Sequence, residues 1–215
     1  MKRLILFDLD GTLIDPYDAI TKGAKFALEH AGFEIKDRSI IIPFIGPPLR
    51  NSIRKFTKIT DEDKIEEIVA KYREYFAEHG IYENTLYPGI KEMLEKLKKA
   101  GYPVVIATSK LQLNAVEIAE YLGIAQYFDL IIGCEPDGAR SEKNEVIEHV
   151  LALMGDKTKS PVIIGDRKFD IIGAKLTGIE SIGVTWGYGP REELEEAGAD
   201  YIADSVDELL QIIGV

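Results

Sequence analysis

Short apolar runs alternate with helical patterns along most of this chain, and this alternation restricts the fold more than any other feature of the sequence. The apolar runs are rich in Val, Ile and Leu and lie at residues 2–8, 102–107, 129–133, 161–165 and 179–184. Apolar residues at helical spacing separate the last four runs. Strands that are apolar on both faces and are joined through helices form a parallel sheet with helices on both sides. We therefore predict an α/β fold, with a final helix at 205–213.

The segment after the first run has a different pattern. Residues 15 to about 82 are predicted to be mostly helical, because Asp15 is a suitable N-cap, Pro16 suits the first helical position, and apolar residues recur at helical spacing from Ile65 to Phe76. A chain of 215 residues is long enough for a sheet core with such an insertion. The predicted domains are a Rossmann-like core of residues 1–14 and 86–215 and an all-helical cap of residues 15–85.

Charge and cysteine content limit the partners and the compartment. The formal net charge is -11, from 26 Lys and Arg against 37 Asp and Glu, and no basic run is present. This balance argues against a nucleic acid or an anionic membrane as a partner. Cys134 is the only cysteine, which excludes an intrachain disulfide, and the first apolar run already ends at Asp8, too early for a signal sequence. We therefore expect a cytoplasmic protein; the sequence leaves its oligomeric state open.

Polar residues follow the predicted strands where the strands end. These residues are Asp8 and Asp10 after the first strand, Thr108, Ser109 and Lys110 after the second, Lys143 at the start of the helix after the third, and Asp166 and Asp170 after the fourth. In open parallel sheets, ligands bind beyond the carboxyl ends of the strands, at a switch in strand order. The sequence therefore predicts a single polar site at this edge of the sheet.

These segments resemble the four motifs of the haloacid dehalogenase superfamily. "DLDGT" at residues 8–12 is similar to the first motif, Thr108 or Ser109 to the second, Lys143 to the third, and "GDRKFD" at residues 165–170 to the fourth. The insertion resembles the helical first-position cap of the phosphoglycolate phosphatase branch. The resemblance implies a Mg2+-dependent phosphatase that acts through an aspartyl-phosphate.

The resemblance also implies a role for each carboxylate. Asp8 is the expected nucleophile and a metal ligand, and Asp166 is the expected second ligand. Asp10 is the expected general acid and base, and its backbone carbonyl is a third metal ligand. Asp170 is expected at or next to the metal. The competing interpretations are a helix N-cap for Asp166 and a solvated helix residue for Asp170.

Phosphate contacts are expected from several polar groups. Gly11 suits a sharp turn whose N–H groups approach phosphate, and the Thr12 hydroxyl can hold local geometry. Thr108 is favoured over Ser109 as the phosphate hydroxyl, with Ser109 as a further contact. Lys143 is favoured over Lys110 as the phosphate lysine, with Lys110 as a substrate contact.

Two stretches of the sequence carry weaker signals. Arg50, within "FIGPPLRNSI", could meet a substrate anion, but a helix connector explains this stretch equally well. The turn Trp186-Gly187-Tyr188-Gly189 follows the last long strand and resembles a turn of phosphoglycolate-phosphatase-like proteins. Structural packing explains this turn equally well.

The predicted activity is hydrolysis of small phosphorylated metabolites, with phosphoglycolate as one candidate substrate. A 5'-nucleotidase or a pyrophosphatase of the same family is the first alternative, followed by a sugar phosphomutase, which "TSK" at residues 108–110 disfavours. A phospho-acceptor signalling module belongs to another class. Such modules lack a cap and lack an acid/base residue two positions after the acceptor.

Overall fold

The computed structural model describes residues 3–155 and 159–215. Its contacts divide the chain into two compact units. One unit is the continuous segment Pro16–Thr85, and the other combines Met1–Asp15 with Leu86–Val215. The two units are described separately below.

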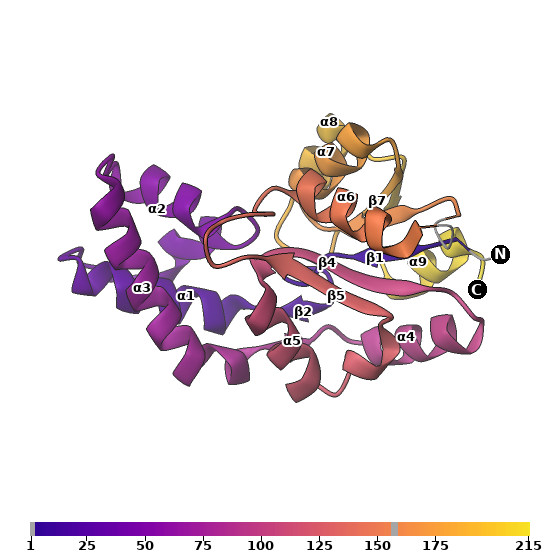
Figure 1. Ribbon diagram of the computed structural model, residues 1–215, viewed down its shortest axis with the longest axis horizontal. Helices are drawn as coiled ribbons and strands as arrows, with labels where there is room; N and C mark the ends of the chain where they lie inside the picture. The colour runs from indigo at the N-terminus through magenta and orange to yellow at the C-terminus, as the bar shows by residue number, and fades with distance from the viewer. Residues whose placement is uncertain (1–2, 156–158) are drawn as a thin grey trace. The chain divides into compact units, whose positions relative to one another are not determined.

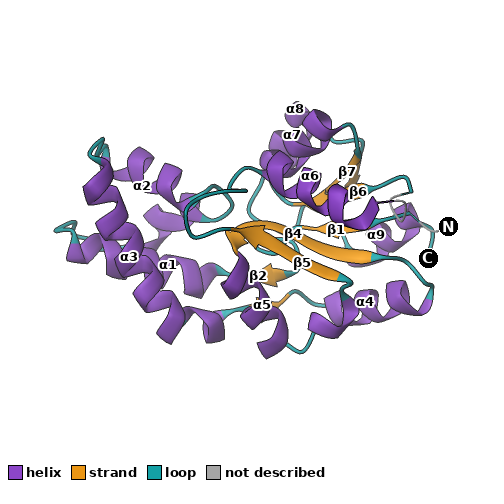
Figure 2. Ribbon diagram, in the orientation of Figure 1, coloured by secondary structure: helices purple, strands orange, loops and turns teal. Residues whose placement is uncertain are grey.

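The larger unit is built on a parallel sheet with strand order β5-β4-β1-β6-β7-β8 (Figure 2). The strands are β1 (Ile5–Phe7), β4 (Val104–Leu111), β5 (Leu130–Cys134), β6 (Val162–Gly165), β7 (Glu180–Val184) and β8 (Tyr201–Ala203). Every neighbouring pair is parallel. The order is that of a Rossmann-like sheet, so the predicted α/β fold class is confirmed.

Helices cover both faces of this sheet (Figure 1). They are α4 (Ile90–Lys99), α5 (Gln112–Tyr121), α6 (Lys143–Met154), α7 (Lys168–Thr177), α8 (Arg191–Ala197) and α9 (Val206–Ile213). Helices α6 and α7 pack on one face, with α8 beside α7, whereas α4 and α5 lie on the opposite face and α9 packs against α4. Buried side chains such as Leu6, Val105 and Ile163 join the central strands to α6.

Strand β1 lies at the centre of the sheet, where the strand order reverses. Phe7 pairs with Ile106 of β4 on one side and with Ile164 of β6 on the other. The residues that follow these three strands therefore leave the sheet at one edge and close together. This edge is the switch point at which open α/β sheets bind ligands.

Three details of the chain differ from the sequence predictions. Helix α8 and strand β8 were not predicted; the apolar run of β8 has only three residues, which is too short to indicate a strand on its own. The prediction that Asp15 caps a helix is wrong, because Ile14–Asp15 forms β2, which pairs with β3 (Thr85–Leu86). Pro16 therefore precedes α1 as its cap residue instead of being its first helical residue.

The smaller unit consists mainly of helices. Its elements are α1 (Tyr17–His30), the 3-10 helix η1 (Arg38–Phe44), α2 (Leu49–Thr57), α3 (Glu62–Glu78) and the 3-10 helix η2 (Gly80–Glu83). The Asp61 side chain caps α3 by accepting hydrogen bonds from Asp63 N and Lys64 N. No helix in the described part of the chain has the length and apolar character needed to cross a membrane.

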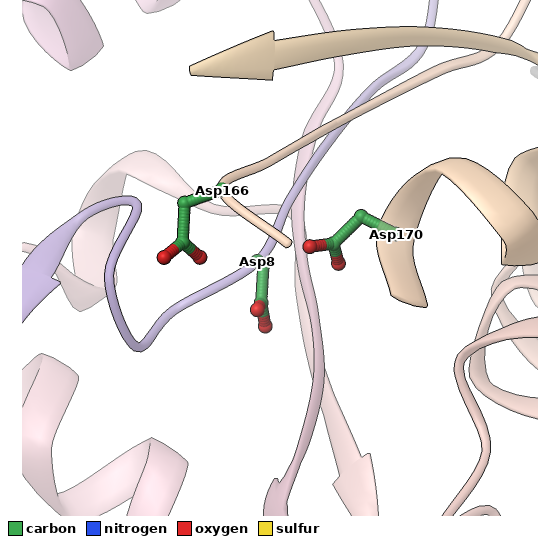
Figure 3. Close-up of side chains that lie close together, drawn as sticks. All are labelled: Asp8, Asp166 and Asp170. Carbon is green, nitrogen blue, oxygen red and sulfur yellow. The ribbon is translucent and has the colours of Figure 1, made fainter. Parts of the chain in front are cut away.

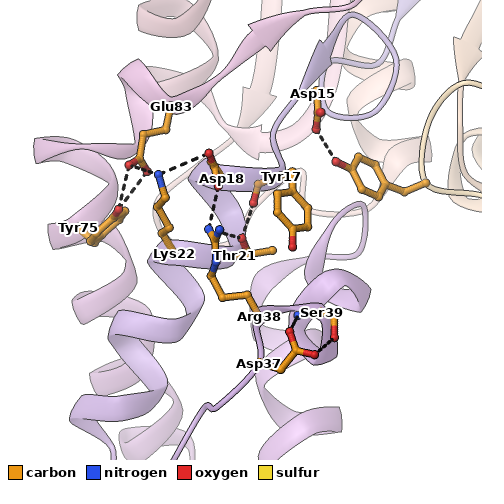
Figure 4. Close-up of polar contacts among 11 residues, drawn as sticks. Asp15, Tyr17, Asp18, Thr21, Lys22, Asp37, Arg38, Ser39, Tyr75 and Glu83 are labelled. Carbon is orange, nitrogen blue, oxygen red and sulfur yellow. Dashed lines mark hydrogen bonds and ion pairs between the residues drawn. The ribbon is translucent and has the colours of Figure 1, made fainter.

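A polar network joins the helices of the smaller unit (Figure 4). The Glu83 carboxylate of η2 accepts hydrogen bonds from Lys22 of α1 at 2.9 Å and from the Tyr75 hydroxyl of α3 at 3.0 Å. Arg38 of η1 donates to Asp18 of α1 at 2.8 Å. Burial, followed by the hydrogen bond to Glu83, raises the pKa of Tyr75 to about 12. The network therefore links α1, α3 and both 3-10 helices.

Candidate active site

Three buried carboxylates form the centre of the candidate site (Figure 3). Asp8 follows β1, Asp166 follows β6, and Asp170 lies in the first turn of α7. Each residue offers a carboxylate oxygen, and these oxygens lie within 4.8 Å of one another. The sheet register explains the arrangement, because β1 and β6 are paired and the Asp8 N–H donates to Ile164 O at 2.8 Å.

Lys143 supplies the positive charge closest to this cluster. It is the first residue of α6, and its buried Nζ lies 2.8 Å from Asp8 Oδ1, 2.9 Å from Asp170 Oδ1 and 3.1 Å from the Ala107 carbonyl oxygen. Burial opposes the charged form of Lys143, but the carboxylates of Asp170 and Asp8 outweigh it and hold its pKa above the ordinary value. The cluster therefore combines three carboxylates with one ammonium group.

Burial raises the pKa of two carboxyl groups of the cluster, and the neighbouring carboxylates act in the same direction. Burial, followed by repulsion from Asp170 and Asp8, raises the pKa of Asp166 to about 8. Burial raises the pKa of Asp170 to about 6, against the lowering effect of Lys143. An oxygen-only set of carboxylates with unbalanced negative charge is the donor set that Mg2+ prefers. The three residues can therefore hold a divalent cation.

Asp10 lies beside a different lysine. Lys110 Nζ donates to both carboxylate oxygens of Asp10, at distances of 2.8 and 3.0 Å, and both side chains are largely buried. Burial raises the pKa of Asp10, while the Lys110 charge and hydrogen bond act in the opposite direction. The two lysines are thus divided between the two first-motif carboxylates, with Lys143 at Asp8 and Lys110 at Asp10.

The second predicted motif lies within β4, which continues to Leu111 through a register shift after Ala107. Thr108 is buried, and its Oγ1 accepts the Lys110 N–H at 3.2 Å. Ser109 is partly exposed. Thr108 directly follows Ala107, and the Ala107 carbonyl accepts a hydrogen bond from Lys143 of the cluster. The assignment of a phosphate contact to Thr108 or Ser109 stays a prediction.

Gly11 and Thr12 form the turn after β1 and contact Asp166. The Gly11 N–H donates to Ile14 O at 2.8 Å, so a phosphate contact through this group would require that hydrogen bond to break. Gly11 has a φ of +79°, and a Cβ atom there would lie 2.2 Å from Asp166 Oδ2. The Thr12 hydroxyl lies 3.4 Å from Asp166 Oδ1. A turn with positive φ and no space for a side chain therefore requires glycine.

The structure disagrees with the two competing interpretations of the fourth-motif carboxylates, and their roles at a metal stay predictions. The cap position of α7 is Arg167, not Asp166. Asp170 is buried, and its Oδ2 accepts the Arg167 N–H at 3.1 Å, so it is not a solvated helix residue. Arg50 lies in α2 of the smaller unit and pairs with Glu66 at 2.5 and 2.9 Å, so its predicted substrate contact stays a prediction.

One contact to the cluster was not predicted from the sequence. The Tyr188 N–H, in the turn after β7, donates to Asp166 Oδ2 at 2.7 Å. The sequence did contain a signal for it, because the turn from Trp186 to Gly189 follows a strand end like the other site residues.

Comparisons with known proteins identify relatives that are similar over nearly the whole chain. A 5'-nucleotidase from Pseudomonas aeruginosa is 39% identical over 209 residues, covering 97% of this chain and 94% of the relative. A phosphoglycolate phosphatase from Vibrio parahaemolyticus is 30% identical over 220 residues, covering 99% and 96%. The crystal structure of a predicted phosphatase from Clostridium acetobutylicum has a TM-score of 0.94 and 41% identity, covering 99% of this chain and 98% of that chain.

The family model of the haloacid dehalogenase-like hydrolases matches residues 5–184. This range includes β1, the helical insertion and β7, and therefore every carboxylate and lysine described above. The resemblance expected from the four motifs is confirmed. The chain belongs to the haloacid dehalogenase-like hydrolase family.

Proposed function

We propose that this protein is a Mg2+-dependent phosphatase that hydrolyses small phosphate monoesters through a phosphorylated aspartate. The observation that carries the proposal is the contact of Lys143 with both Asp8 and Asp170, next to Asp166, in a buried cluster at the switch point of the sheet. The phosphatase relatives reported above support the same reaction class.

The bound cation would be held by Asp8, Asp166 and Asp170, with the backbone carbonyl of Asp10 as a further ligand. An anionic carboxylate and an anionic phosphate repel each other by about 4 kcal/mol at 4 Å in a medium of effective dielectric 20. Bound Mg2+ supplies the positive charge that offsets this repulsion. Lys143 contributes a second positive charge next to the nucleophile.

The reaction proceeds in two displacements. An Asp8 carboxylate oxygen forms a bond to phosphorus while the bond between phosphorus and the leaving oxygen breaks. Asp10 gives its proton to that oxygen, and burial, which raises the pKa of Asp10, favours the protonated form needed for this step. Water then attacks phosphorus, Asp10 takes back a proton, and phosphate leaves while Asp8 is regenerated.

The Lys110 contact must loosen during this cycle, because a carboxylate held by an ammonium group is a poor proton donor. A substrate anion that attracts Lys110 would free Asp10 to act as the acid. Phosphoglycolate, nucleoside 5'-monophosphates and pyrophosphate all offer such a group. We therefore propose small phosphorylated metabolites as the substrate class. A cytoplasmic location is proposed on the cysteine content, since Cys134 is the only cysteine.

The decisive experiment measures phosphate release from a panel of these esters. We expect turnover with Mg2+, none with excess chelator, and none in Asp8→Asn, which keeps the side-chain volume but removes the nucleophile. Asp63→Asn, at an exposed position of α3, is the matched control and should retain turnover. Turnover by Asp8→Asn, or turnover that excess chelator leaves unchanged, would refute the proposal.

A further inference from the structure

The turn from Trp186 to Gly189 has no role in the reaction described above. It follows β7, the strand that neighbours β6 in the sheet, so it leaves the sheet next to the segment that carries Asp166. The turn contacts both Asp166 and the loop after β1. These contacts fall into two groups.

The first group consists of hydrogen bonds from the turn to the site. The Tyr188 N–H donates to Asp166 Oδ2 at 2.7 Å, and the indole N–H of Trp186 donates to the Thr12 carbonyl oxygen at 3.0 Å. The Tyr188 hydroxyl also donates to the Asp15 carboxylate. The turn is therefore connected both to a cluster carboxylate and to the segment that follows the nucleophile.

The second group consists of close approaches that only glycine permits. A Cβ atom on Gly187 would lie 2.3 Å from the Gly11 carbonyl oxygen and 2.4 Å from both Cβ and Oδ2 of Asp166. A Cβ atom on Gly189 would lie 2.0 Å from the Asp166 carbonyl oxygen. Side-chain atoms never approach backbone atoms this closely, so the turn packs directly against the main chain and carboxylate of Asp166.

Asp166 needs such support because its neighbours repel it. Asp8 and Asp170 are buried carboxylates with oxygens within 4.8 Å of a carboxylate oxygen of Asp166, so like charges face one another at short range. A free side chain would rotate away from these charges. Gly11 on one side and the turn on the other occupy the space needed for that rotation, and the Tyr188 N–H fixes one carboxylate oxygen.

We propose that residues Trp186–Gly189 are a positioning element that holds the Asp166 carboxylate in the orientation for binding a divalent cation. The inference rests on the proposed function, since it assumes that Asp166 is a metal ligand. Gly187 acts in this element by packing against Asp166, and Trp186 acts through its hydrogen bond to the loop after β1. Groups that orient metal ligands typically change metal affinity by roughly 10–100-fold when they are removed.

The test is Mg2+ binding by Gly187→Ala, measured by titration calorimetry and by the Mg2+-induced shift in melting temperature. We expect Mg2+ affinity to fall roughly tenfold or more, and kcat to recover at high Mg2+. Gly183→Ala is the matched control, because it lies in β7 and its new Cβ would meet Leu194 Cδ1 at 2.9 Å, away from the carboxylates. This control should lose stability but bind Mg2+ within about twofold of the wild-type affinity, because it leaves the Asp166 contacts intact.

Trp186→Phe keeps an aromatic ring but removes the hydrogen bond to the Thr12 carbonyl oxygen. If Gly187→Ala fails to fold, Mg2+ binding by Trp186→Phe tests the positioning role instead. Weaker Mg2+ binding by folded Trp186→Phe would support the positioning role. Wild-type affinity in every folded variant of the turn would overturn it while leaving the proposed function intact. Absence of Mg2+ binding by the wild-type protein would overturn both.

Discussion

Replacing Lys143 by Met should destabilise the protein in a way that depends strongly on pH. The substitution keeps an unbranched apolar stem but removes the ammonium group from between Asp8 and Asp170. Both carboxylates are buried, so water cannot take over the role of the lost cation. The variant therefore measures how much of the folded state depends on this charge.

The magnitude follows from the distances. At 2.8 and 2.9 Å, an effective dielectric of 20 gives about 6 kcal/mol of attraction for each of the two pairs. Desolvation of the ammonium group offsets several kcal/mol of this attraction, so we expect a net loss of about 3–5 kcal/mol in the free energy of unfolding at pH 8 without metal.

The dependence on pH has a definite sign. Loss of the Lys143 charge raises the pKa of Asp170 further above its value in an unfolded chain, because Lys143 now lowers it. At pH values between the pKa of Asp170 in the unfolded chain and its pKa in the folded variant, the folded variant binds more protons than the unfolded chain. The stability of the variant therefore falls as pH rises, by up to about 1.4 kcal/mol per pH unit for each such group.

Urea denaturation at pH 5.5 and pH 8, with and without Mg2+, measures these effects. We expect the loss to be smaller at pH 5.5 and smaller with Mg2+, which restores positive charge to the cluster. Lys98→Met is the control, because Lys98 lies 3.3 Å from Asp129 at an exposed pair, where a loss within about 1 kcal/mol is usual. A loss in Lys143→Met that matches this control at pH 8, or that is the same at both pH values, would refute the reasoning.

Three further predictions address other parts of the molecule. Burial raises the pKa of Asp166 to about 8, well above its value in an unfolded chain, so Mg2+ competes with a proton at this carboxylate below pH 8. Mg2+ should therefore raise the melting temperature more at pH 8.5 than at pH 6.5, and equal shifts would contradict this reasoning. Lys110→Met should raise the pKa of Asp10, since Lys110 lowers it. The alkaline limb of the pH profile of kcat/KM should then move to higher pH, and an unchanged limb would argue against Asp10 as the acid. Asn84→Ala should cost about 1–3 kcal/mol in urea denaturation, because the buried amide donates to two main-chain carbonyls of η2, at 2.6 and 3.1 Å; an unchanged midpoint would contradict the role of these bonds.

The sequence alone determined most strands of the core sheet and the chemical character of the site. The apolar runs predicted five of the six strands of the core sheet. The carboxylates Asp8, Asp166 and Asp170 were predicted to lie together because parallel strands end at the same edge of a sheet. These inferences succeed because periodicity and strand ends are local properties of the chain.

The tertiary structure decided which charged groups are partners. From the sequence, Lys110 and Lys143 were competing phosphate lysines, and Asp170 was either a ligand neighbour or a solvated residue. The folded chain pairs Lys110 with Asp10 and sets Lys143 between Asp8 and Asp170. These pairings depend on the order of the strands and on where α6 begins relative to β4, which no short-range pattern encodes.

The turn at Trp186–Gly189 was predicted from the sequence only in part. Its residues were noted as a turn at a strand end, but their contact with Asp166 depends on the pairing of β7 with β6. Helices follow from hydrogen bonds within a few residues, and strands are indicated by local runs of apolar residues, so the sequence predicts both directly. Contacts between loops that are distant in the sequence arise only when the strands are assembled in order, and therefore only the folded sheet reveals them.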